Sequence, residues 1–142
     1  MSRVHLHEPL RRQVVERASG RCEYCLLHQD DVPFSHQVDH IVPLKHGGRT
    51  ISENLAVACL ECNRHKGSDL TAIDPEDGEI SSLFSPRLQN WDEHFAVDDA
   101  RIVGRTATGR ATASLLRMNE RKRVAERRAL IDAGRWPPTS ST

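Results

Sequence analysis

Four cysteines, an adjacent Asp–His pair and two asparagines are the residues of this 142-residue chain whose types and spacing could do chemistry. In chain order they are Cys22, Cys25, Asp39, His40, Asn54, Cys59, Cys62 and Asn63. An Asp–His pair alone is common, so the order of the whole set is the informative feature. It predicts a frame held by the cysteines, which presents an acid, an imidazole and amides to a phosphodiester.

The cysteines form two Cys-x-x-Cys pairs, at 22/25 and 59/62. A disulfide framework needs an oxidising compartment, and the chain shows no export signal. Two such pairs are instead typical of a tetrahedral, structural Zn²⁺ site with four thiolate ligands. A redox dithiol or unliganded cysteines are the alternatives. The 33 residues between Cys25 and Cys59 exceed the needs of a compact ribbon, so we expect this segment to have structure of its own.

Phosphodiester hydrolysis requires an activated water, a cation at the scissile phosphate and help for the departing oxygen. The imidazole of His40 can act as the base because its ordinary pKa lies near neutrality. Asp39 can offer a hard oxygen ligand to Mg²⁺ or Mn²⁺, and the Asn63 amide oxygen a second one. Neighbouring side chains of a strand point to opposite faces. Asp39 and His40 can therefore address one phosphate only if the chain bends after Asp39.

Other polar residues near this set have supporting roles in the prediction. The Asn54 amide is expected to bond loop backbone near His40 and so fix the imidazole. Lys66 and Arg64 are predicted to clamp phosphate. His65 is included among the residues predicted to contact nucleic acid, although a surface position is the plainer interpretation.

The surrounding pattern predicts an α+β fold. A helix should run from Pro9 to about 18, and Gly20 should end it. The elements expected after it are a short strand at 34–39, an ordered loop at 41–53, a strand at 55–58, a knuckle and helix at 59–67, an acidic loop at 68–81, a hairpin at 95–103 with a three-residue connection at 98–100, and helices from 108 and over 120–133. Apolar positions on the last helix are Val124, Ala125, Leu130 and Ile131. We expect two units, residues 1–70 and residues 71–142.

Charge is unevenly distributed although the net charge is zero. Residues 101–142 carry ten basic and three acidic side chains, a net charge of +7. This favours a polyanionic partner for the basic helices, with a solvated helical face as the alternative. No apolar run approaches the roughly 18 residues that a membrane span needs. We therefore expect a cytoplasmic protein with no membrane contact.

Five stretches resemble the HNH endonuclease family, in its four-cysteine, zinc-containing branch. They are Cys22–Cys25 (CEYC), Val38–Leu44 (VDHIVPL), His46–Gly48 (HGG), Glu53–Leu55 (ENL) and Cys59–Gly67 (CLECNRHKG). The second half is similar to an extension found on some bacterial HNH proteins. The stretches that carry this second likeness are 84–87 (FSPR), 90–91, 94–95, 104–106 (GRT), 109–112 (GRAT) and 134–138 (GRWPP).

The resemblance implies a ββα-metal core in which a histidine activates water and one divalent cation lies beside the scissile phosphate. Products would carry a 5′-phosphate and a 3′-hydroxyl. His40 matches the general base, Asp39 the metal ligand beside it and Asn54 the residue that orients the loop. Position 63 matches the last metal ligand, which is His in many members and Asn here, and His65 is a candidate substitute.

The resulting hypothesis is a metal-dependent endonuclease with DNA as the favoured substrate. The alternative is a non-catalytic, zinc-stapled nucleic-acid-binding module. A toxin-like nuclease that acts with a protein partner is a third interpretation, and the sequence names no such partner.

Overall fold

The computed structural model describes residues 6–139; the outermost ends of the two expected units, 1–5 and 140–142, lie outside them. In chain order the elements are α1 (Glu8–Arg17), η1 (Gln29–Asp31), β1 (Gln37–His40), η2 (Leu44–His46), η3 (Ser52–Asn54), β2 (Leu55–Ala58), α2 (Leu60–Lys66), β3 (Thr71–Ile73), β4 (Ile80–Ser82), α3 (Trp91–His94), β5 (Phe95–Asp98), β6 (Arg101–Gly104), α4 (Ala107–Leu115) and α5 (Arg121–Asp132). Helices and three two-stranded antiparallel sheets make the fold α+β, as predicted. None of the helices within 6–139 combines the length and the apolar character that a membrane crossing requires.

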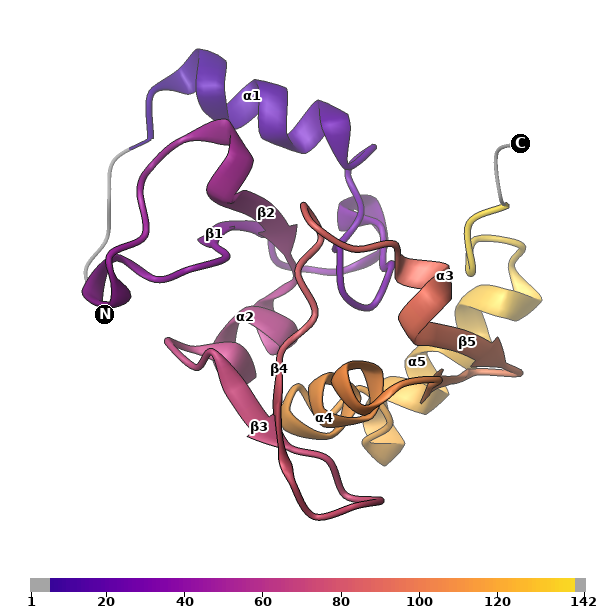
Figure 1. Ribbon diagram of the computed structural model, residues 1–142. Coiled ribbons are helices and arrows are strands. Elements are labelled where there is room, and N and C mark those ends of the chain that lie inside the picture. The colour runs from indigo at the N-terminus through magenta and orange to yellow at the C-terminus, as the bar shows by residue number, and fades with distance from the viewer. Residues whose placement is uncertain (1–5, 140–142) are drawn as a thin grey trace.

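The predicted core elements are present, with one shifted boundary. Strand β1 pairs antiparallel with β2, and His40 lies opposite Leu55. The strand begins at Gln37 instead of 34 and continues through His40. Helix α1 packs on this hairpin through buried Val14, Leu55 and Val57. In Figure 1, α1 crosses above the β1–β2 hairpin, and α2 follows on the hairpin's other side.

The second half contains three elements that the sequence pattern did not reveal. Residues 68–81 were predicted to be loop, but they contain β3 and the first two residues of β4, and these strands pair with Ile73 opposite Ile80. These strands have only three residues each, too few for a clear alternation. The short helix α3 was also missed. The predicted hairpin at 95–103 is confirmed, but its connection has two residues, because Asp98 pairs with Arg101. Asp99 takes the positive φ of 56° that this tight turn requires.

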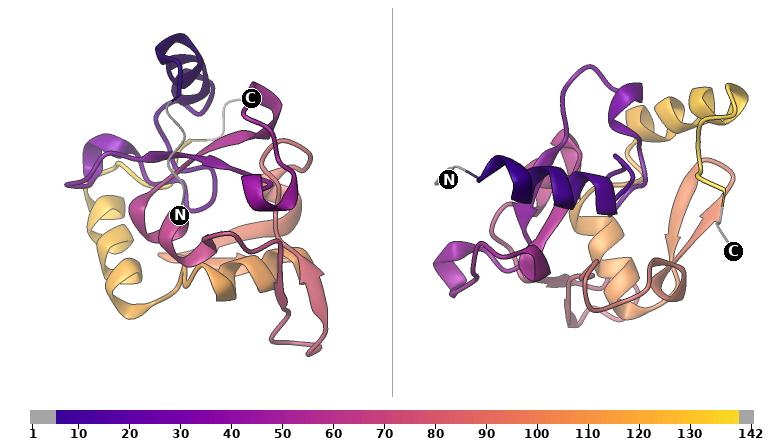
Figure 2. Two further views of the ribbon diagram at one scale, coloured as in Figure 1. Left: turned by 90° about the vertical axis from the view of Figure 1, so that its left-hand side faces the viewer. Right: turned by 90° about the horizontal axis from the view of Figure 1, so that it is seen from above.

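One hydrophobic core joins the two halves of the chain. Its buried members are Cys22, Tyr24, Cys25, Leu27, Ala58, Cys59, Cys62, Phe84, Phe95, Ile102, Ala113, Leu116, Met118 and Trp136. The views in Figures 1 and 2 place α4 and α5 at the end of the molecule opposite α1, with the hairpin β1–β2 and α2 between them. The cysteine cluster therefore lies at the junction of the HNH-like segment and the C-terminal part.

Helix α5 buries two arginines, while its apolar residues Leu130 and Ile131 are partly buried against the core. The residues that it buries are Arg123 and Arg127, which are 3% and 0% exposed. They are four positions apart and so share one side of the helix. The Arg127 guanidinium donates to the carbonyl oxygens of Ala100 and Met118, at 2.8 and 2.7 Å. Two of the basic residues that suggested a polyanion-binding face thus point into the protein.

Candidate active site and metal centre

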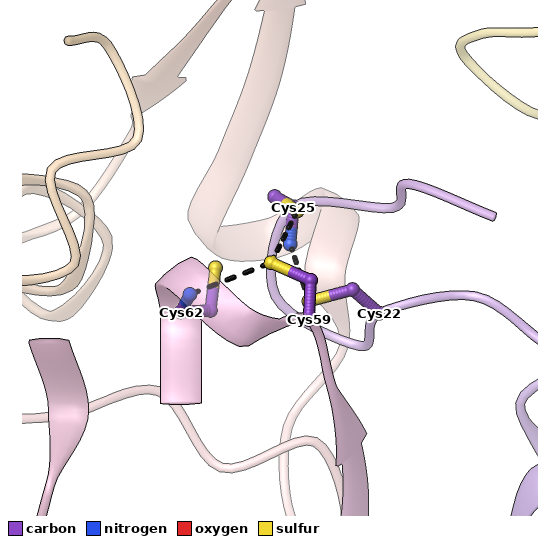
Figure 3. Close-up of side chains that lie close together, drawn as sticks. All are labelled: Cys22, Cys25, Cys59 and Cys62. Carbon is purple, nitrogen blue, oxygen red and sulfur yellow. Dashed lines mark hydrogen bonds between the residues drawn. The ribbon is translucent and has the colours of Figure 1, made fainter. Parts of the chain in front are cut away.

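The four cysteine side chains converge on one point. Figure 3 shows their sulfur atoms facing one another; Cys22 and Cys25 come from the turn after α1, and Cys59 and Cys62 from the start of α2. All four Sγ atoms lie within 4.8 Å of one another, and Cys25 and Cys59 are 3.6 Å apart. Zinc–sulfur bonds of about 2.3 Å in a tetrahedron place sulfurs about 3.8 Å apart. The cluster therefore fits a tetrathiolate metal site.

Backbone amides bond to two of the clustered sulfurs, and all four thiols are buried. The amide of Cys25 donates to Cys22 Sγ, and the amide of Cys62 donates to Cys59 Sγ, both at 3.4 Å. Cys59 is also the N-cap of α2, so the second pair is fixed by the start of the helix. Burial raises the pKa of the Cys22 and Cys62 thiols, whereas hydrogen bonds from the other three cysteines lower the pKa of the Cys25 thiol. A bound cation is therefore what would hold all four as thiolates.

Helix α2 meets the end of β1 through a buried ion pair. Lys66 Nζ lies 2.9 Å from Asp39 Oδ2, and their side chains are 2% and 13% exposed. Among residues 6–139, no donor other than this ammonium meets Asp39 Oδ2. Lys66 Nζ also donates to the His40 carbonyl oxygen at 3.1 Å. Burial raises the pKa of Asp39, and Lys66 opposes that rise.

These contacts correct the role predicted for Lys66. A phosphate clamp must reach solvent, whereas this ammonium is buried and bonded to two groups of β1. The basic run after the second cysteine pair does not distinguish the two residues in sequence, although Arg64 is exposed and Lys66 is buried. Lys66 holds the Asp39 carboxylate and the end of β1 against α2 and is not free to meet a phosphate.

The His40 imidazole is held by a residue that the sequence did not single out. Its Nε2 lies 2.9 Å from Thr50 Oγ1 across the loop. Burial lowers the pKa of His40, and Asp39 partly opposes this. The ring is therefore neutral at neutral pH, the form that a base requires. Thr50 is ten residues further along the chain, and no spacing rule connects it with His40.

The bend predicted between Asp39 and His40 comes one residue later. Both residues belong to β1, opposite Ala56 and Leu55 respectively. Asp39 contacts α2, while the His40 imidazole turns to the loop that follows the strand. The two side chains thus leave the strand end on different sides, with the His40 carbonyl bonded to Lys66 between them.

Asn54 closes the loop that starts at this strand end. Its Oδ1 accepts from the Val42 amide at 2.9 Å, and its Nδ2 donates to the carbonyls of Val42 and Arg49 at 3.0 and 2.9 Å. A Cβ at Gly48 would lie 1.7 Å from the Val42 oxygen, so only glycine permits this closure. This is the loop-holding contact expected of Asn54, and its effect on catalysis stays a prediction.

The other predicted residues of α2 divide into two groups. Asn63 is half-buried and precedes Lys66 by three positions, so the two residues are neighbours on the surface of α2. Arg64 is exposed and pairs with Glu61 at 2.7 Å. His65 Nε2 lies 3.3 Å from the same carboxylate. The structure therefore brings Asp39 and Lys66 together, and turns Arg64 and His65 toward Glu61.

Replacing Lys66 by Met should lower the free energy of unfolding by about 3–5 kcal/mol, because the buried Asp39 carboxylate loses its counter-charge. Urea denaturation followed by circular dichroism measures the change. Arg64→Met is the matched control, and its effect should stay within about 1 kcal/mol because an exposed ion pair contributes little. Equal stability of the two variants would show that the Lys66–Asp39 pair does not hold α2 to β1.

Comparison with known proteins agrees with this geometry. Residues 22–69 match the family model of the HNH endonuclease, so this segment of the chain is an HNH endonuclease domain. It spans both cysteine pairs, β1, the loop, β2 and α2. The chain is also 22% identical, over 120 residues, to the Septu protein PtuB of Bacillus thuringiensis. That match covers 83% of this chain and 44% of the relative, so the chain spans less than half the length of that protein.

Proposed function

We propose that the chain is a metal-dependent endonuclease that hydrolyses phosphodiester bonds in nucleic acid, with DNA as the favoured substrate. The supporting observation is the HNH domain at 22–69, in which a histidine whose pKa is lowered by burial follows a buried carboxylate directly at the end of β1. Four free cysteines suit a reducing compartment such as the cytoplasm.

In this proposal His40 accepts a proton from the attacking water. When its Nε2 carries the ring proton and donates to Thr50 Oγ1, its Nδ1 is left as the acceptor. Thr50 and the loop closed by Asn54 therefore set the direction of the basic nitrogen. The exposed Arg64, with His65 beside it, is available to contact the nucleic-acid backbone once its partner Glu61 is displaced.

Asp39 and Asn63 are the residues that would hold Mg²⁺ or Mn²⁺. The Asp39 carboxylate supplies the hard oxygen that such an ion prefers, and because its Oδ2 already faces Lys66 Nζ at 2.9 Å, the ion would share the carboxylate with that ammonium. When bound, the ion would act as a Lewis acid that stabilises charge on the phosphate and the departing oxygen. Lys66 opposes the rise in the pKa of Asp39 that burial causes.

The ion pair between Lys66 and Asp39 also favours a second candidate function. An ammonium already neutralises the carboxylate, as it would in a non-catalytic, zinc-stapled module that only binds nucleic acid. In that case the cysteine cluster and the α2–β1 contact would serve the fold alone.

A cleavage assay distinguishes the two functions. Purified protein is incubated with supercoiled plasmid, linear duplex and single strands, each with Mg²⁺, Mn²⁺ or chelator, and binding is measured in parallel by mobility shift. The endonuclease should nick or linearise the plasmid only when a divalent cation is present. Binding without cleavage under every cation, by protein that retains its zinc, would establish the module instead.

A further inference from the structure

A buried arginine from the C-terminal part reaches the cysteine cluster. Arg123 Nη2 on α5 lies 3.0 Å from Cys62 Sγ and 3.8 Å from Cys59 Sγ. The side chain is 3% exposed. Its other terminal nitrogen, Nη1, donates to the carbonyls of Leu116 and Arg117 at 2.6 and 3.2 Å. The guanidinium is therefore fixed between the end of α4 and the sulfurs.

No carboxylate in the described part of the chain pairs with Arg123 or with Arg127, one turn further along α5. Arg127 is fully buried, and its guanidinium lies 5.4 Å from the centre of the Trp136 ring. The indole Nε1 of Trp136 in turn donates to the Cys25 carbonyl at 3.1 Å. Arg123 thus contacts the cysteine cluster directly, Arg127 is linked to it through Trp136, and neither has an acidic side chain to balance it.

Charge balance indicates which group could neutralise the two buried guanidiniums. Four thiolates around one Zn²⁺ carry a net charge of −2, and two guanidiniums carry +2. Burying either charge alone is costly, whereas burying them together is much less so. With four neutral thiols, two buried cations would remain uncompensated. A metal-loaded tetrathiolate therefore compensates the charge of the buried arginines, and the arginines compensate its charge in return.

We propose that Arg123 is a positioning residue of the metal centre, which holds the Cys62 and Cys59 thiolates by charge and hydrogen bonding and thereby slows the loss of zinc. The C-terminal part then has a defined task, because it completes the outer shell of a metal site whose four ligands all lie in the HNH domain. This inference rests on zinc binding at the cysteines and does not depend on nuclease activity.

The test compares Arg123→Gln with Arg121→Gln, a matched control that removes the same charge from an exposed position of the same helix. Zinc content is measured by elemental analysis, zinc affinity by competition with a chelator, and zinc release with a chromogenic chelator. Outer-shell changes typically cost 10–100-fold in metal affinity. We therefore expect Arg123→Gln to bind zinc about 10–100-fold more weakly and Arg121→Gln to match the wild type. In the Co²⁺-loaded protein, the thiolate-to-cobalt charge-transfer band of Arg123→Gln should move to longer wavelength.

Each other outcome also decides the proposal. Wild-type affinity, release rate and cobalt spectrum in folded Arg123→Gln would overturn it, as would an equal loss in Arg121→Gln. If Arg123→Gln does not fold, Arg123→Lys decides, because it keeps the charge: affinity within about 10-fold of wild type supports the proposal, and a larger loss overturns it. Failure of both variants to fold in excess zinc would assign Arg123 to packing alone. If the wild-type protein contains no zinc, the metal site itself is refuted, whatever the nuclease assay shows.

Discussion

The His40→Ala variant should cleave plasmid DNA about 10²–10⁴-fold more slowly than wild type, since general-base catalysis contributes a factor of that size. Folding and zinc content should be unchanged, because the half-buried imidazole makes one side-chain hydrogen bond, to Thr50, and is remote in sequence from the cysteines. The measurement is the rate of loss of supercoiled plasmid in Mg²⁺, alongside elemental analysis and a thermal melt.

The pH dependence of the wild-type cleavage rate is a second test of His40 as the general base. Burial lowers the pKa of His40 below its ordinary value of 6.5. The neutral ring predominates above that lowered pKa, so the rate should hold from neutral pH down past 6.5 and fall only as the pH drops through the lowered value. His40→Ala should show no such acid limb in its residual rate.

The matched control for His40 is His7→Ala, at an exposed position whose side chain makes no capping bond to α1. It should cleave at the wild-type rate and guards against contaminating nuclease, because all three proteins are purified identically. If His40→Ala and His7→Ala cleave equally fast, His40 is not the base, and Thr50 then holds an imidazole without a chemical role.

The Cys59→Ser variant should lose its folded structure. Structural zinc contributes folding free energy outright, on the order of 10–16 kcal/mol in zinc-finger peptides, which matches or exceeds the 5–15 kcal/mol stability of a typical domain. The loss should extend beyond the HNH domain, because Cys59 belongs to the core that both halves share. Circular dichroism, a thermal melt and zinc analysis measure it.

Two comparisons make the Cys59 prediction sharp. Leu60→Ser changes the adjacent, 39%-exposed residue and should fold and bind zinc normally. Wild-type protein stripped of metal by a strong chelator should behave as Cys59→Ser does. A soluble Cys59→Ser protein without zinc, melting cooperatively near the wild-type temperature, would show that packing alone sustains the fold and would refute the structural role of the metal.

The sequence by itself determined the features that depend on near neighbours. The spacing of the Cys-x-x-Cys pairs predicts the cluster, because two residues between ligands suit one turn around a metal. The run Leu55–Ala58 is apolar throughout and forms β2 as predicted, and Gly48 marks the tight loop that Asn54 closes. In each case the information lies within a few residues of the position concerned.

Only the tertiary structure decided how charged residues from distant segments combine. In the sequence Lys66 and Arg123 are ordinary members of basic runs, which favour a surface in contact with a polyanion. The fold buries both, one against Asp39 and the other against Cys62. A charge becomes stable inside a protein only when its partner is placed there as well. Because those partners lie 27 and 61 residues away in the chain, no local pattern could reveal the pairing.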